Sequence, residues 1–158
     1  MKTVNAQAQT IGGFSVVGLT ARTCNKDGQA THDINALWQQ FFDLAVGEAI
    51  PHKDGEAIYA VYHDYEGDHE QPYKLTVGCR VTDDGVALPD GLSSVYVPEA
   101  DYAVFSAQGE QPQALLNTWE AIWKSDINRA YGCDVEVYGP RFFEPGVHEI
   151  LVCVGVKQ

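Results

Sequence analysis

The sequence contains no run of about 18 consecutive apolar residues, which is the length that a membrane-spanning helix needs. The N-terminal stretch MKTVNAQAQT also lacks the apolar segment of a secretory signal peptide. Basic residues are scarce, because 10 Lys and Arg face 22 Asp and Glu, for a formal net charge of −12. A field of this sign repels phosphate backbones, so we expect neither direct nucleic-acid binding nor a membrane partner. The acidic excess attracts cations or simply confers solubility, and charge alone does not distinguish these roles.

Catalytic and metal-binding motifs are missing as well. The chain has no GxSxG, HExxH, P-loop or GxGxxG motif. Its cysteines, Cys24, Cys79, Cys133 and Cys153, form no CxxC pair or metal-type spacing, so we expect reduced thiols, no cofactor and a cytoplasmic location. The segment HDYEGDHE, residues 63–70, offers side chains that suit a divalent metal. Its spacing matches no metal-site template, and its place between two predicted strands favours a polar hairpin loop.

The amino-acid composition of the chain is typical of one globular domain. The chain has 158 residues, of which 45% are hydrophobic and 20% charged, enough to build a core, and we expect a single domain over residues 1–158. Helical periodicity marks residues 33–46 (DINALWQQFFDLAV) and 112–127 (PQALLNTWEAIWKSDI). Asp33 is expected to cap the first helix, and Pro112 fits the first turn of the second.

Each predicted helix follows one strand-like run and precedes two more, which makes the chain an internal repeat. Both halves, about residues 10–82 and 92–158, therefore have the order β-α-β-β, with the turn-rich segment TDDGVALPDG between them. The segment LWQQFF aligns with TWEAIW, and AVY aligns with EVY. This self-similarity predicts an α+β fold, an antiparallel sheet with helices, a pseudo-two-fold axis and a central groove. The strand-like runs are residues 14–21, 57–65, 73–81, 102–109, 134–139 and 148–156.

The repeat draws attention to Glu136. It lies in DVEVYGP, residues 134–140, whose period-2 alternation predicts a half-buried strand, and it takes the place of Ala60 in the first half. A carboxylate beside aromatic rings in a partly dry pocket attracts a cation. The alternative is an exposed strand glutamate beside core aromatics, and the pattern by itself favours this alternative. The aromatic candidates for lining a cleft are Trp38, Tyr59, Tyr62, Trp119 and Tyr138.

Beyond its pattern, the chain resembles the GyrI-like effector-binding domain family, which includes ligand domains of AraC-type multidrug regulators. The resemblance runs from about Phe14 to Lys157, through the segments FSVVGLTA, NALWQQFF, IYAVYHDYEGD, YKLTVGC, LLNTWEAIW, YGCDVEVYGP and VHEILVCVGVK. Within the family, the chain is most similar to stand-alone effector-binding proteins encoded by integron cassettes, which bind cationic drugs. The resemblance implies two β-α-β-β units of the SHS2 type, and an aromatic groove with one buried acidic residue that selects organic cations.

In the family the acidic position matches Glu136, and Glu149 is a second candidate that we expect to be solvated. The resemblance reverses the preference drawn from the pattern alone, and it favours Glu136 as the anchor for a lipophilic, cationic aromatic compound. The matching aromatic positions are Trp119 and Tyr138, followed by Tyr59, Tyr62 and Trp38.

Family regulators carry a DNA-binding module before this domain, and the about 13 residues before the first predicted strand leave no room for one. We therefore expect a small-molecule-binding protein that sequesters its ligand or reports it to a separate protein partner, with a homodimer through an edge strand also possible. Two alternatives stay open. One is a small hydrolase of strained electrophiles, with Glu136 as general base beside Tyr138. The other is a gyrase-inhibitor-like protein that binds a protein partner.

Overall fold

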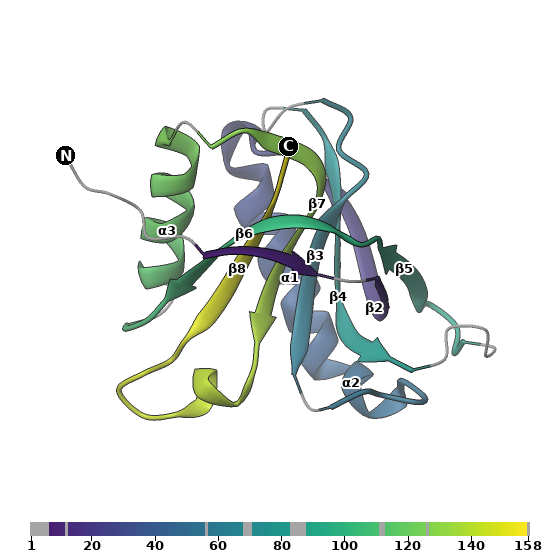
Figure 1. Cartoon of the computed structure of the whole chain (residues 1–158). Helices are drawn as coiled ribbons and strands as arrows, with labels where there is room; N and C mark the ends of the chain where they lie inside the picture. The colour runs from purple at the N-terminus through teal and green to yellow at the C-terminus, as the bar shows by residue number, and fades with distance from the viewer. Residues whose placement is uncertain are drawn as a thin grey trace.

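The computed structural model describes residues 7–11, 13–55, 57–67, 71–82, 88–110, 113–125 and 127–157, except the side chains of Asp27 and Tyr131. Within these ranges the chain forms one antiparallel eight-stranded sheet in the order β1-β6-β8-β7-β3-β4-β2-β5, with helices packed on it (Figure 1). The predicted α+β fold is confirmed. The strands are β1 (Gln7–Ile11), β2 (Phe14–Thr23), β3 (Ile58–His63), β4 (Tyr73–Val81), β5 (Ser93–Val97), β6 (Ala100–Ala107), β7 (Arg129–Tyr138) and β8 (Ile150–Val156). The helices are α1 (Gln29–Asp43), α2 (Val46–Ala49) and α3 (Gln113–Lys124), with short 3₁₀ helices η1 (Lys26–Gly28) and η2 (Pro140–Phe143).

The strand order is symmetric about its centre. Exchanging β2, β3, β4 and β5 with β6, β7, β8 and β1 reverses the order of the sheet. The centre lies between β3 and β7, which pair antiparallel with Ala60 directly opposite Glu136. The two positions that the sequence repeat aligns therefore face each other across the pseudo-two-fold axis.

Both long helices cover the same face of the sheet. One core cluster joins Leu37 and Phe41 of α1, Ile122 of α3 and strand residues such as Val77 and Val152. Helix α1 contacts β2 and β4, whereas α3 contacts β6. The central strands β3 and β7 therefore lie between the two helices, and their helix-facing side chains form the floor of the space between them.

The opposite face of the sheet curls around a second cluster. Ile11 of β1 and Val97 of β5 belong to this cluster together with Val61 and Val135, although β1 and β5 are the two ends of the strand order. In Figure 1, β1 and β6 cross in front of the central strands, because the sheet bends back over its own face. Curvature of this kind follows from the right-handed twist of long antiparallel sheets.

The expected helix start at Asp33 is wrong. Helix α1 begins four residues earlier, at Gln29, because Gly28 adopts a left-handed backbone (φ 73°) that lets the chain turn into the helix. Asp33 lies inside the helix, where its carboxylate accepts a hydrogen bond of 3.2 Å from the Gln29 side-chain amide. The helix also ends at Asp43 rather than at residue 46. Pro112 lies outside the described residues.

Some strands differ from the prediction too. The sequence pattern did not predict β1, in which four of the five residues are exposed, or the short β5, in which Val97 is the one buried residue. Strand β7 begins at Arg129, five residues before the predicted start, and its pairing with β8 shifts register between Arg129 and Asp134. Residues 73–81 form β4 as predicted.

The segment of residues 63–70 is only partly a loop. His63 belongs to β3 and is buried, Asp64 pairs with Lys74 at 3.3 Å, and residues 68–70 lie outside the described part. The described residues contain no group of three or more His, Cys, Asp or Glu that could hold a metal ion. They also contain no helix long and apolar enough to cross a membrane, and no disulfide joins the four cysteines.

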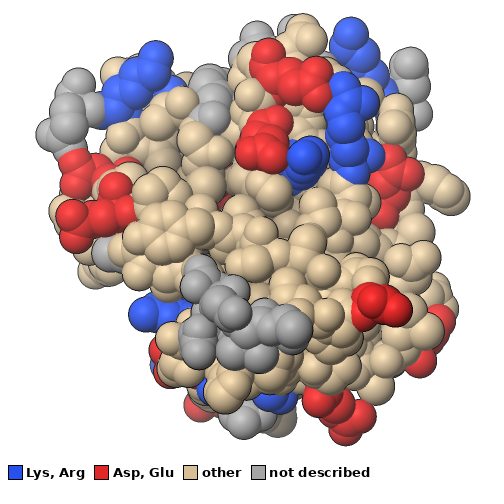
Figure 2. Space-filling view, turned by 90° about the vertical axis from the view of Figure 1, so that its right-hand side faces the viewer, with Lys and Arg blue, Asp and Glu red and all other residues tan. Residues whose placement is uncertain are grey.

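The side of the molecule that carries β2 and β5 is shown in Figure 2. Acidic and basic side chains lie next to one another there, and uncharged residues cover most of the face. The net charge of −12 is therefore not gathered into one acidic patch on this side.

Candidate functional site

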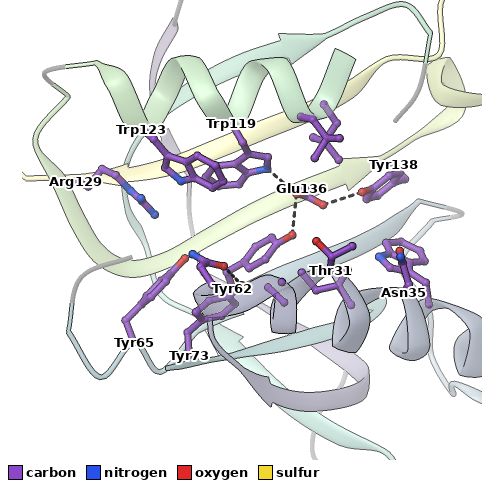
Figure 3. A pocket seen from close by; sticks show the side chains of 17 residues that line it. Thr31, Asn35, Tyr62, Tyr65, Tyr73, Trp119, Trp123, Arg129, Glu136 and Tyr138 are labelled. Atoms are coloured by element: carbon purple, nitrogen blue, oxygen red, sulfur yellow. Dashed lines mark hydrogen bonds between the residues drawn. The ribbon is translucent and has the colours of Figure 1, made fainter. Parts of the chain in front are cut away.

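A cavity of about 440 Å³ lies between α1 and α3, above the central strands (Figure 3). Helix α1 contributes residues such as Ile34 and Trp38 to one wall, and α3 contributes Leu115 and Trp119 to the other. We call this space the central cavity. Its volume lies within the range of about 300–1,000 Å³ that is common for small-molecule sites.

The floor of the central cavity is the carboxylate of Glu136, which three neutral donors hold in place. The Tyr62 hydroxyl donates to Oε2 at 2.9 Å and the Trp119 Nε1–H to the same oxygen at 2.8 Å. The Tyr138 hydroxyl donates to Oε1 at 2.7 Å. Figure 3 shows these side chains converging on the carboxylate from three sides.

Local sequence explains this convergence. Because side chains alternate along a strand, Glu136 and Tyr138 share the helix-facing side of β7, and Ala60 and Tyr62 share that side of β3. Tyr62 pairs in register with Asp134, on the far side of Glu136 from Tyr138. The two phenols therefore flank the carboxylate as a pseudo-symmetric pair, while small Ala60 leaves room for it.

Glu136 is buried, and its burial changes the pKa of its carboxyl. The residue is only 2% exposed, and burial raises the pKa of its carboxyl, although the hydrogen bonds from Tyr138, Trp119 and Tyr62 partly oppose that rise. None of the ion pairs formed by the described residues includes Glu136. The central cavity thus contains an acidic group that has hydrogen-bond donors and no internal counter-ion.

A second buried carboxylate, Asp134, lies two residues earlier on the same face of β7. Its Oδ2 accepts from the Arg129 guanidinium at 2.7 Å and from the Tyr65 hydroxyl at 2.5 Å, and its Oδ1 accepts from the Gly155 amide at 2.9 Å. The Arg129 guanidinium also lies over the ring of Trp119, 5.8 Å from its centroid. The charge of Asp134 is balanced inside the protein.

Aromatic rings surround the carboxylate of Glu136 on both sides. Trp38 meets Tyr138 edge to face at a centroid distance of 4.9 Å, and Trp119 meets Tyr62 in the same way at 5.7 Å. Trp123, which also lines the central cavity, is 47% exposed. The central cavity is thus lined by aromatic rings, and part of this aromatic surface is open to solvent.

Five of the six predicted site residues line the central cavity: Trp38, Tyr62, Trp119, Glu136 and Tyr138. The expectation for Tyr59 is corrected. Its ring packs against Phe14 at a centroid distance of 5.7 Å, in the cluster on the opposite face of the sheet. Tyr59 and Tyr62 are three positions apart, and side chains an odd number of positions apart point to opposite faces of a strand.

Glu149 lies away from the central cavity. It accepts a hydrogen bond from Ser106 and pairs with Arg141 at 2.8 Å, and these contacts hold the pKa of its carboxyl below its usual value. Because Glu149 is already paired with Arg141, its charge is not available to a ligand. Contrary to the expectation of a solvated side chain, Glu149 is only 13% exposed.

Sequence reasoning missed several lining residues, among them Tyr65, Tyr73 and Arg129. Tyr65 and Tyr73 lie at the ends of the hairpin between β3 and β4, and Arg129 lies before the register shift in β7. No periodic pattern could have placed them beside Glu136. The aromatic content of the hairpin, with Tyr62, Tyr65 and Tyr73 close together in sequence, was the available signal.

The arrangement is suited to binding a positively charged organic molecule. Glu136 is an acidic residue of the central cavity that pairs with no cation of the described residues, and one carboxylate falls short of the six to eight oxygen ligands that a calcium ion takes. The rings contribute apolar contact and, for a cation, attraction to their faces.

Comparisons with known proteins show the family of this chain and several structures with a similar fold. A family model described as an integron-associated effector binding protein matches residues 9–154. A comparison with curated proteins gave no match. An integron cassette protein from the mobile metagenome of Vibrio cholerae has a similar structure, with a TM-score of 0.75 and 27% identity over 96% of this chain and 95% of that one.

Two further solved structures share the fold at lower identity. SAV2435 bound to tetraphenylphosphonium has a TM-score of 0.77 and 17% identity, over 98% of this chain and 94% of that one. A putative transcription regulation protein from Staphylococcus aureus has a TM-score of 0.72 and 18% identity, over 99% and 100%. At these identities the likeness concerns the fold alone.

Proposed function

This chain belongs to the family of integron-associated effector binding proteins, and from that premise we propose that it binds lipophilic organic cations in the central cavity. Glu136 supplies the negative charge, and the aromatic walls supply apolar contact. The ligand leaves the cavity unchanged, since binding is the role that an effector-binding family implies.

The observation that carries this proposal is the state of Glu136. A buried carboxylate costs free energy unless a positive charge or enough hydrogen bonds compensate it. Three neutral donors compensate Glu136 in part, and no cation of the described residues pairs with it. A ligand cation completes the compensation, whereas an anionic ligand faces an uncompensated like charge.

The size and lining of the central cavity support an aromatic ligand. A space of about 440 Å³ lined by Trp and Tyr side chains accommodates several aromatic rings. SAV2435, which has the same fold, was solved with tetraphenylphosphonium, a compact cation with four phenyl rings. That compound is therefore a reasonable first probe for this chain.

The test compares tetraphenylphosphonium with tetraphenylborate, an anion of nearly the same shape, in titrations followed by tryptophan fluorescence. We expect saturable binding of the cation and at least tenfold weaker binding of the anion. Glu136→Gln should weaken cation binding about 5–150-fold, which corresponds to about 1–3 kcal/mol. Glu120→Gln, an equal change of charge at an exposed position on α3, is the matched control and should leave the affinity unchanged.

Equal affinity for the two probes, or a Glu136→Gln variant that binds the cation as wild type does, would contradict the proposal. Recovery of a chemically altered ligand after prolonged incubation would contradict the absence of turnover. Chromatography of the ligand after release from wild-type protein measures this directly.

A further inference from the structure

The two tryptophans that the internal repeat places in equivalent positions have different surroundings. Trp38 on α1 and Trp119 on α3 align in the repeat, and both line the central cavity. Each meets one of the two phenols that donate to Glu136. Their remaining contacts differ, and this difference bears on where a ligand's positive charge lies.

Trp119 already has a cation. The Arg129 guanidinium lies over its ring at 5.8 Å from the centroid, and Asp134 holds that guanidinium in place through a hydrogen bond of 2.7 Å. The indole N–H of Trp119 is committed to Glu136, and the residue as a whole is buried. Figure 3 shows Arg129 at the Trp119 and Trp123 end of the cavity. Because the guanidinium already lies over the Trp119 ring, that ring face is not available to the positive charge of a ligand.

Trp38 has apolar and phenolic neighbours instead. Phe42 stacks on it at 5.9 Å with an angle of 22° between the planes, and Tyr138 meets it edge to face. Neither cation–π contact formed by the described residues involves Trp38. The residue is partly exposed and lines the central cavity, so its ring remains accessible to a ligand.

We infer that the ligand's positive charge is held in the half of the central cavity formed by Trp38 and Tyr138, whereas the half formed by Trp119 receives the uncharged part. This inference rests on the proposed function and names Trp38 as the residue that recognises the charge together with Glu136. The aromatic faces of the two halves look alike, but the internal guanidinium makes one of them unfavourable for a second cation.

The test uses fluorinated tryptophan, because fluorine weakens the attraction of an indole ring for a cation while changing its shape little. Wild-type protein is produced with tryptophan carrying increasing numbers of fluorine atoms, and the affinity for benzyltrimethylammonium, a cation whose charge and aromatic ring lie at opposite ends, is measured for each form. The series is repeated in Trp38→Leu, in which the only labelled residues are Trp119 and Trp123. Circular dichroism establishes that every form is folded.

We expect the affinity of the wild-type protein to fall stepwise with fluorination, by about 2–30-fold over the series. In Trp38→Leu the unlabelled protein should bind about 2–30-fold more weakly than wild type, and fluorination should change its affinity by less than about twofold. A fluorination effect that persists in Trp38→Leu would overturn the inference, since it would place the charge at Trp119 or Trp123. A wild-type affinity indifferent to fluorination would overturn it as well.

The two proposals fail in different ways. If wild-type protein binds tetraphenylphosphonium no better than tetraphenylborate, the proposed function fails. If the cation binds selectively and depends on Glu136, while the fluorination series does not depend on Trp38, the proposed function stands and the inference about Trp38 alone is wrong.

Discussion

Two carboxylates of one strand, Asp134 and Glu136, show how differently the protein treats a buried charge. They lie two residues apart on the same face of β7, and their exposed fractions are 0% and 2%. Asp134 has a guanidinium within 2.7 Å, whereas Glu136 has two phenols and an indole. Burial of a charge is costly in both cases.

The difference separates a carboxylate whose charge is balanced by a guanidinium from one that has only neutral hydrogen-bond donors among the described residues. A carboxylate with an internal cation gains little from a ligand, because its charge is already balanced. A carboxylate that has only neutral donors gains from any cation that can reach it. We therefore expect the Arg129–Asp134 pair to stabilise the fold, whereas Glu136 is the carboxylate that lines the central cavity.

The largest expected effect comes from removing the internal cation. Arg129→Met leaves Asp134 buried without its counter-ion, and we expect a loss of about 3–5 kcal/mol in the free energy of unfolding, measured by chemical denaturation. The matched control is Arg22→Met, which breaks the exposed pair with Glu66 and should cost about 0–1 kcal/mol. Similar losses in the two variants would remove the distinction between the buried pair and the surface pair.

Glu136→Gln is the counterpart within the same comparison. Where the carboxyl is ionised, this variant removes a charge that no described residue balances, so its free energy of unfolding should stay equal to that of wild type or increase by about 1 kcal/mol. A loss as large as that of Arg129→Met would mean that Glu136 is structural too.

An intermediate effect is expected from pH. Burial raises the pKa of the Glu136 carboxyl, so its contribution to stability is full below the ordinary glutamate pKa and is lost as pH rises through the raised value. Cation binding follows the opposite direction, because only the ionised carboxylate attracts the ligand. The affinity for tetraphenylphosphonium, which does not titrate, should fall as pH drops below that pKa and level off at the affinity of the neutral form, about 5–150-fold weaker.

Titrations of the cation from about pH 4 to about pH 9 measure this dependence. In Glu136→Gln the dependence should disappear. If it persists there, another titrating group controls binding, and the raised pKa of Glu136 has no part in it.

The smallest expected effect separates two tyrosines of β3. Tyr62→Phe removes one donor from Glu136, so the pKa of the carboxyl should rise further and the pH midpoint of cation binding should move up by about half a unit to one unit. Tyr59→Phe changes the opposite face of the sheet and should leave the midpoint where it is in wild type. Equal shifts in both variants would show that the hydrogen bond from Tyr62 is not what tunes Glu136.

Much of the fold was predictable because both of its organising signals are local. The stripe of Leu37, Trp38 and Phe41 indicates a helix without reference to the rest of the chain, and the alternation around Glu136 indicates a strand in the same way. The match between the two halves then predicted the pairing of like units. Strands β1 and β5 were missed because both are edge strands of five residues, too short and with too few buried side chains to give a clear signal.

The position of Tyr59 follows from a local signal, the alternation of side chains along β3. Alternation places it on the side of β3 opposite Tyr62, and the structure finds it there, packed on Phe14. The helix start illustrates a different limit. Asp33 is a good capping residue by type, yet the helix begins after Gly28. The left-handed backbone of Gly28 sets this start, and a pattern of residue types does not reveal it.

Local sequence patterns predicted the fold class, the repeat and the position of an acidic residue on a central strand, because periodicity and self-similarity are properties of neighbours along the chain. Tertiary contacts alone show that Asp134 has Arg129 as its counter-ion, while none of the described residues provides one for Glu136. That distinction depends on which side chains from separate strands and helices reach within about 3 Å of each carboxylate. Distances of this kind arise from strand register and helix packing, which join residues that the sequence keeps far apart.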